Sequence, residues 1–456
     1  MRSAATRASN EASSISRELI SVTPVVERAL LVGAPLKRAG ARKSLDEHLK
    51  ELARLADTAG AEVVGILTQQ LDRPHPGTYL GKGKIEELKS MVAEKGATLI
   101  IFDDELSPSQ GKNVEDIVGT RVVDRAELIL DIFATRARSS EAKMQVELAQ
   151  LEYTLPRLTR MWTHLEKFRG GIGVRGPGET QLETDRRLIN HRIKLLKERL
   201  QHVQQNRAVQ RQSRADSFKA SIVGYTNAGK SSILRGMTGA TDVHVEDRLF
   251  ATLDPLTREV DLGENAHALL TDTVGFIRKL PHHLVASFRA TLEETRDADL
   301  LLHVVDASHP LWEEQRLVVD QVLLELGLAE QPVLLVFNKM DLLSESDALA
   351  LQERVTALVP NAVFVSTETE NGLDPLSRAL RHAMRARRPV AEVWLQPSDG
   401  KLLAEIHQHG EVLDQRSEGE QMVIRARLPE RLRGRLEQAG ADVRVENGVT
   451  QRVPAV

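Results

Sequence analysis

The sequence predicts an α/β multidomain protein that contains a phosphate-binding domain with a mostly parallel sheet. Two stretches of the chain alternate short apolar runs with helical patterns, and a long leucine-rich helical region lies between them. In the second stretch, a glycine-rich loop joins a strand pattern to a helix pattern at 224–231. The 456 residues are enough for roughly two to four domains of ordinary size.

Composition restricts the class of protein. The chain has no cysteine, which excludes disulfides and thiolate metal sites and favours a reducing compartment. The longest apolar runs, such as 300–305 and 333–337, are too short to cross a bilayer. Residues 1–23 lack the apolar region and cleavage site of a secretory signal, so we expect a mobile extension and a cytoplasmic protein.

Residues 24–138 are expected to form an N-terminal α/β subdomain. Strand patterns at 29–32, 63–67 and 97–102 alternate with helical patterns at 44–58 and 85–94. Ser107 is a predicted N-cap, with Pro108 in the first turn of its helix and Gln110 able to reach back. The run Gly81-Lys82-Gly83-Lys84 is interpreted as another helix start, and a second nucleotide site there is the alternative.

Residues 139–214 are expected to form an antiparallel helical hairpin. Apolar residues recur every three or four positions over 148–168 and again over 182–203. Pro156 is expected to interrupt and kink the first helix. The basic, glycine-rich segment 169–178 is expected to form the turn of the hairpin. Residues 157–214 contain 14 Lys and Arg against 5 Asp and Glu, so this segment carries +9 while the whole chain carries −4. Such a segment suits a polyanionic partner, and a solvated helix face is the alternative.

Two further domains follow the hairpin. Residues 215–388 alternate strands with helices again, with strand patterns at 218–223, 268–273, 300–306, 333–338 and 363–366. Residues 389–456 contain three apolar runs separated by helical patterns, which predicts a small C-terminal α+β domain.

The loop Gly224-Tyr225-Thr226-Asn227-Ala228-Gly229-Lys230-Ser231 matches a phosphate-binding loop. Its glycines allow backbone N–H groups to converge on a phosphate, and the following helix adds its dipole. Lys230 can bridge the β- and γ-phosphate oxygens, and the Ser231 hydroxyl can bind Mg²⁺.

Two later segments complete the predicted phosphate and Mg²⁺ site. Asp272-Thr273-Val274-Gly275 ends an apolar strand, where Asp272 can hold Mg²⁺ through water and the Gly275 N–H can face the γ-phosphate. In Phe250-Ala251-Thr252-Leu253-Asp254, the Thr252 hydroxyl is the natural second protein ligand of Mg²⁺. Lys230, Thr252 and Gly275 are therefore the predicted catalytic residues.

The base is predicted to bind at Asn338-Lys339-Met340-Asp341, which follows an apolar strand. The Asp341 carboxylate can accept two hydrogen bonds from the N1–H and amino group of guanine, and adenine offers no such pair. Ser366-Thr367-Glu368 would complete the pocket with backbone N–H groups. The four elements in this order predict GTP as the ligand.

Catalysis is predicted to need help from a partner. Small GTPases commonly place a water-positioning glutamine after the glycine that corresponds to Gly275, and this chain has Phe276 there. Slow intrinsic hydrolysis is therefore expected. Asn227 is similar to the asparagine of GTPases that use bound K⁺ as an accelerating charge, and a local loop hydrogen bond is the alternative.

The chain resembles HflX-type ribosome-associated GTPases over nearly its whole length. The resemblance rests on segments 77–84, 105–110 and 145–151, and above all on the run 170–187, GGIGVRGPGETQLETDRR. It implies a hairpin that reaches into the large ribosomal subunit, binding to 50S and 70S particles, splitting of stalled ribosomes, and an N-terminal region that restrains GTP turnover. The resemblance and the basic charge make four residues candidates for rRNA contacts: Arg169, Arg175, Arg186 and Arg187.

The sequence departs from the usual pattern of this family at a few positions, and an alternative function is open. Thr367 stands where the family usually has Ala, but a backbone contact to the base survives that change. We expect a monomer. The alternative function is a GTP-regulated binding module whose hairpin meets a non-ribosomal RNA or a protein.

Overall fold

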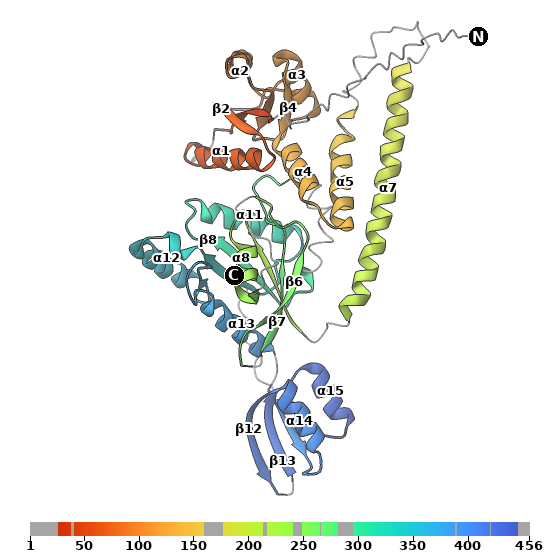
Figure 1. Ribbon diagram of the computed structural model, residues 1–456, viewed down its shortest axis with the longest axis vertical. Coiled ribbons are helices and arrows are strands. Elements are labelled where there is room, and N and C mark those ends of the chain that lie inside the picture. The colour runs from red at the N-terminus through yellow and green to blue at the C-terminus, as the bar shows by residue number, and fades with distance from the viewer. Residues whose placement is uncertain are drawn as a thin grey trace, which may run out of the picture.

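The computed structural model describes residues 26–37, 41–158, 177–212, 217–239, 249–264, 266–280, 295–387, 390–419 and 421–445. The predicted extension at 1–23 lies outside these ranges, and so do residues 169–176 of the predicted hairpin turn at 169–178. The elements form an N-terminal α/β subdomain, a pair of long helices, a central α/β domain and a small α+β domain, as the sequence predicts (Figure 1).

The N-terminal subdomain is a parallel sheet covered on both faces. Its strands run in the order β2-β1-β3-β4, and every pair is parallel. Helices α1 and α4 pack on one face and α2 and α3 on the other. The elements are β1 (Arg28–Gly33), α1 (Ala41–Thr58), β2 (Glu62–Thr68), α2 (Lys82–Lys95), β3 (Leu99–Phe102), α3 (Pro108–Val118), β4 (Arg121–Asp124) and α4 (Arg125–Arg136).

Two predicted helix starts in this subdomain are confirmed. The capping box at Ser107 forms, because its side chain accepts from the Gln110 backbone N–H and the Gln110 side chain accepts from the Ser107 N–H. Gly81 is the N-cap of α2, so the run from Gly81 to Lys84 begins a helix.

The hairpin consists of α5 (Ser140–Thr154) and α7 (Pro177–Gln212), which lie side by side (Figure 1). Leu148 on α5 packs with Leu196 and Leu200 on α7, as the apolar spacing predicts. Pro156 interrupts the first helix as predicted: α5 ends at Thr154, a turn follows, and Leu158 is helical again, because proline at position 156 offers no N–H to extend the helix. Helix α7 begins at Pro177, within the predicted turn.

The central sheet has the strand order β10-β9-β8-β5-β7-β6. Every pair is parallel except β6–β7, and β6 is a strand that the sequence patterns did not indicate. Helices α8 and α13 cover one face and α11 and α12 the other. The elements are β5 (Phe218–Gly224), α8 (Lys230–Thr238), β6 (Leu256–Asp261), β7 (His267–Asp272), β8 (Leu300–Asp306), α11 (Trp312–Glu325), β9 (Val333–Asn338), α12 (Glu345–Leu358), β10 (Val363–Phe364) and α13 (Asp374–Arg387).

The C-terminal domain is an antiparallel sheet with two helices packed on its apolar face. The chain runs β11 (Val390–Leu395), α14 (Gly400–His409), β12 (Glu411–Glu418), β13 (Gln421–Arg427), α15 (Glu430–Gln438) and β14 (Asp442–Val445). Strand β12 was also missed, because it is a largely exposed edge strand with few apolar residues.

Candidate nucleotide-binding site

The glycine-rich loop turns between β5 and α8 as predicted. Gly229 has φ 92°, and a Cβ built on it would lie 2.1 Å from Asn338 Nδ2, so a side chain at position 229 would collide with Asn338. The Asn338 amide instead donates to the Ala228 carbonyl at 3.0 Å. Asn338 of the predicted base motif therefore fixes the shape of the phosphate loop.

Lys230 lies at the floor of the loop and is buried. Its Nζ donates to the Tyr225 carbonyl at 2.8 Å. Burial lowers the pKa of Lys230 to about 8, although Asp272 opposes the shift. A Cβ on Gly275 would lie 3.0 Å from Lys230 Nζ and 2.8 Å from Thr226 Cα, so this close approach requires glycine. Lys230 and Gly275, both predicted to contact the phosphates, thus lie next to each other.

Three oxygen-bearing side chains converge beside Lys230. Ser231 Oγ lies 2.8 Å from Thr252 Oγ1 and donates to Asp272 Oδ2 at 2.6 Å. Asp272 Oδ1 is buried and accepts no hydrogen bond from any described residue, and burial raises the pKa of this carboxyl. Hydroxyl and carboxylate oxygens are what Mg²⁺ prefers, so the residues present fit this ion.

The predicted base pocket is assembled from two strand ends. The Ser366 hydroxyl donates to Asp341 Oδ1 at 2.5 Å and accepts from the Glu368 N–H at 3.1 Å. Lys339, with φ 63°, pairs with Asp306 Oδ2 at 2.8 Å. Ser366 thus orients the Asp341 carboxylate.

These parts line one cavity of about 280 Å³. Most predicted site residues border it: Thr226, Asn227, Gly229, Lys230, Ser231, Phe250, Ala251, Thr252, Thr273, Gly275, Asn338, Lys339, Asp341, Thr367 and Glu368. Ser232 and Leu342 border it as well and were not predicted. The other predicted residues do not border it: Gly224, Tyr225, Ala228, Leu253, Asp254, Asp272, Val274, Met340 and Ser366.

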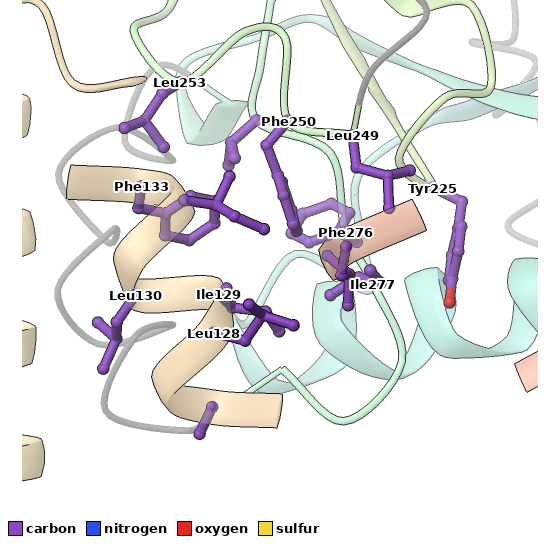
Figure 2. Packing of buried hydrophobic residues seen from close by; sticks show 14 of the residues in the cluster. Leu128, Ile129, Leu130, Phe133, Tyr225, Leu249, Phe250, Leu253, Phe276 and Ile277 are labelled. Carbon is purple, nitrogen blue, oxygen red and sulfur yellow. The ribbon is translucent and has the colours of Figure 1, made fainter. Parts of the chain in front are cut away.

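A hydrophobic cluster connects the nucleotide-binding site to the N-terminal subdomain. Figure 2 shows Phe250, Phe276 and Ile277 packed against side chains of α4, in a cluster that crosses from one domain to the other. The rings of Phe250 and Phe133 meet edge to face with centroids 4.6 Å apart. Phe276 is 1% exposed in this cluster and cannot polarise water.

Tyr225 joins three segments through its hydroxyl. It donates to Glu51 Oε2 on α1 at 2.5 Å and accepts from the Arg278 N–H at 2.9 Å. Burial, with the nearby Glu51 carboxylate, raises the pKa of Tyr225, so the phenol remains a donor. The side chain of this predicted nucleotide-binding residue therefore links the phosphate loop to the N-terminal subdomain.

A buried ion network lies beside Tyr225. Arg125 on α4 is 1% exposed and donates to Asp103 Oδ1 at 2.8 Å and to the Arg278 carbonyl at 3.1 Å. Asp103 Oδ2 also accepts from Arg278 at 3.0 Å and from Lys279 at 2.8 Å. Burial opposes ionisation of Asp103, but Arg125, Arg278 and Lys279 outweigh burial and lower its pKa. Sequence reasoning missed this network because its two halves lie more than 150 residues apart.

Two of the four candidate rRNA-contacting arginines lie within the described residues and two lie outside them. Arg169 and Arg175 lie outside them. Arg186 and Arg187 are exposed on α7, and Arg187 pairs with Glu183 at 2.7 Å. Among the described residues, no helix is both long and apolar enough to cross a membrane.

Comparisons with known proteins match most of the chain. The family models "GTP-binding GTPase N-terminal", "GTP-binding GTPase Middle Region" and "50S ribosome-binding GTPase" match residues 46–134, 136–214 and 219–339. The GTPase HflX of Flavobacterium psychrophilum is 51% identical over 69% of this chain and 76% of the relative. That of Escherichia coli K12 is 46% identical over 79% and 85%.

This chain is also similar to a solved structure, that of a protein named SsGBP in complex with GDP. The match covers 78% of this chain and 98% of the SsGBP chain, with 25% sequence identity and a TM-score of 0.44. The family models and the relatives agree with the geometry of the site: the protein is an enzyme that binds and hydrolyses GTP. The chain belongs to the HflX family of GTPases.

Proposed function

We propose that this GTPase binds the large ribosomal subunit through its helical hairpin and splits or rescues stalled 70S ribosomes under stress. The observation that carries the proposal is the long, basic hairpin mounted on a GTPase domain. The helix α7 alone has 36 residues, which corresponds to about 54 Å of rod. The name of the third matching family model, "50S ribosome-binding GTPase", supports the same partner.

The chain's own residues suit the binding of a Mg²⁺-bound triphosphate. Lys230 would hold the β- and γ-phosphates, and Ser231 and Thr252 would ligate the ion, with Asp272 behind them. When bound, Mg²⁺ would neutralise the charge that develops on the phosphates. Asp341 would select guanine. Among the described residues, no group of three or more histidine or acidic side chains could hold a metal. Phosphate oxygens of the bound nucleotide would supply further ligands of the ion.

The acceleration of hydrolysis is assigned to the partner. Phe276 is locked in the interdomain cluster, so the water-positioning group must come from elsewhere. Asn227 has φ 60° and borders the cavity, which supports the hypothesis of an accelerating K⁺ ion. Replacing K⁺ by Na⁺ in a turnover assay should lower the rate of GTP hydrolysis. An unchanged rate would exclude a catalytic role for K⁺.

The N-terminal subdomain is proposed to restrain turnover until ribosomes bind. Its contacts with Tyr225, Phe250 and Arg278 support this role, because these residues belong to the segments that surround the phosphates. Separating the domains would free those segments to rearrange.

Sedimentation through sucrose tests the partner. With a non-hydrolysable GTP analogue at physiological salt, the full chain should comigrate with 50S particles and remain near the top of the gradient with GDP. Protein that stays free of ribosomes in both states would favour the alternative, a GTP-regulated module acting on a non-ribosomal RNA or protein. Dissociation of 70S particles into subunits, followed in the same gradients, tests the splitting step.

A further inference from the structure

The segment 249–254 lies between the nucleotide cavity and the base of the hairpin. We propose that Asp254 is a positioning residue that couples the nucleotide state to the helical hairpin by holding the start of α5. This inference rests on the proposed function only in taking a guanine nucleotide as the ligand and the hairpin as the part that meets the partner.

Asp254 caps the start of α5 from outside the helix. Its Oδ2 accepts from the backbone N–H groups of Arg138 at 3.2 Å and Ser139 at 3.1 Å, and its Oδ1 accepts from the Ser139 hydroxyl. Ser139 is the N-cap of α5, and its own Oγ accepts from the Ala142 N–H at 3.0 Å. A carboxylate at this place satisfies donors that the helix leaves unpaired and is favoured by the helix dipole. The side chain therefore attaches 249–254 to α5.

The other end of the segment contacts the nucleotide site. Thr252 Oγ1 lies 2.8 Å from Ser231 Oγ, and the Phe250 N–H donates to Thr226 Oγ1 at 3.1 Å. Thr252 and Asp254 are two residues apart, which is at most about 7 Å of extended chain. Phe250 has φ 57°, a strained conformation for a phenylalanine, so its neighbours must hold it there. We therefore expect a shift of Thr252 to reach Asp254 through this short segment.

The hairpin can transmit such a shift because its helices are firmly joined. Arg192 on α7 forms two hydrogen bonds with the Glu147 carboxylate on α5, at 2.6 and 2.9 Å. Lys197 pairs with Glu152 at 2.8 Å, beside the leucine contacts described above. A displacement at the start of α5 is then expected to move α7 with it (Figure 1).

Two spin labels on the full chain measure this coupling. The chain has no cysteine, so labels attach only at introduced positions. Leu188→Cys on α7 and Leu349→Cys on α12 replace side chains that are 62% and 58% exposed. The distance between the labels is measured with Mg²⁺ and either GDP or a non-hydrolysable GTP analogue. In the doubly labelled parent, the distance distribution should differ between the two nucleotides.

Ser139→Ala removes the hydroxyl that Asp254 holds and lies outside the nucleotide cavity. Its affinity for the analogue should stay within about threefold of the parent, as expected for a change at a separate site, and the nucleotide-dependent distance change should be lost. Asp254→Asn should lose the change as well, and the double variant should behave like either single variant. Ser344→Ala is the matched control, because Ser344 is the N-cap of α12 and accepts from Asp347 N–H, away from 249–254. The control should keep the full change.

A distance change that survives in both Ser139→Ala and Asp254→Asn would overturn the coupling role, as would identical distances with both nucleotides in the parent. Failure of the proposed function looks different: calorimetry would then show no guanine nucleotide binding to the parent, or gradients would show no ribosome binding while the distance change persists.

Discussion

At the scale of single residues, we propose that Asp341 recognises the base. Its orientation is set by the Ser366 hydroxyl at 2.5 Å, and neighbouring Lys339 is held by Asp306. A carboxylate so placed presents acceptors to two donors of guanine, and an amide would present a donor to one of them. In this proposal, selectivity for guanine follows from the acceptor-only character of the Asp341 carboxylate.

Asp341→Asn should weaken GTP binding by about 100-fold, because a lost charged hydrogen bond and a mismatched donor together are worth about 2–3 kcal/mol. Xanthosine triphosphate offers an acceptor in place of the amino donor of guanine. Its affinity for the Asp341→Asn variant should therefore fall less than that of GTP, or rise. Calorimetry with both nucleotides measures this, and Asp347→Asn on exposed α12 is the control. Equal losses for the two nucleotides would show that Asp341 does not read the base.

Lys279 is a second residue whose contacts lead to a prediction, here for the rate of GTP hydrolysis. It has φ 55° and reaches Asp103 at 2.8 Å and Asp104 at 2.5 Å in the N-terminal subdomain. Lys279→Gln and Asp104→Asn should each raise GTP turnover without ribosomes. The double variant should turn over no faster than Lys279→Gln, because that change already removes the contact with Asp104. The pair Lys37→Gln and Asp72→Asn, an ion pair within the N-terminal subdomain, should leave the rate unchanged. Additive effects would mean that the two residues act separately.

At the scale of elements, the hairpin depends on a small apolar seam. Leu196 is fully buried between α5 and α7, whereas Leu188 on the same helix is 62% exposed. Burial of such a leucine is what keeps two long helices together in water.

Leu196→Ala should lower the local free energy of opening of the hairpin by about 3 kcal/mol, which raises amide exchange in α5 and α7 by about 100-fold. Leu188→Ala should have little effect, within about 0.5 kcal/mol. Exchange that is equally fast in both variants would place the stabilising contacts elsewhere.

The elements that sequence patterns predict well are those with long-range periodicity or tight turns. The phosphate loop, the capping box at Ser107 and the α5–α7 seam are examples. Strands β6 and β12 escaped prediction because they are edge strands that bury few apolar residues. The contacts of Asp254 and Tyr225 could not be predicted either, because their partners are set by the packing of two domains and not by local spacing.

At the scale of the whole molecule, the interface between the N-terminal and GTPase domains contains histidines as well as ion pairs. His48 on α1 lies 2.8 Å from Glu314 on α11, and residues near it include Arg278 and Asp103. Burial, helped by Arg278, lowers the pKa of His48 despite the two carboxylates. The docked interface therefore favours the neutral imidazole.

Docking should weaken in acid. Because the docked pKa of His48 lies below the ordinary value of about 6.5, its contribution is fully present above that pH and is lost as pH falls through the lowered value. Amide exchange in α1 should rise between pH 7.5 and pH 5.5 after correction for intrinsic rates, and less so in His48→Gln. His267→Gln, on an exposed strand position, is the control. The same pH response in His48→Gln would assign it to other groups.

We propose that the hairpin delivers the ribosome's signal to the GTP site. The most direct measurement is the GTPase rate of the full chain against increasing 50S concentration, compared with a variant that lacks residues 170–178. Saturable stimulation of the full chain and a flat, unstimulated rate for the variant are predicted, with equal basal rates and GTP affinities. Full stimulation of the variant, or no stimulation of the intact chain, would show that the hairpin does not carry this signal.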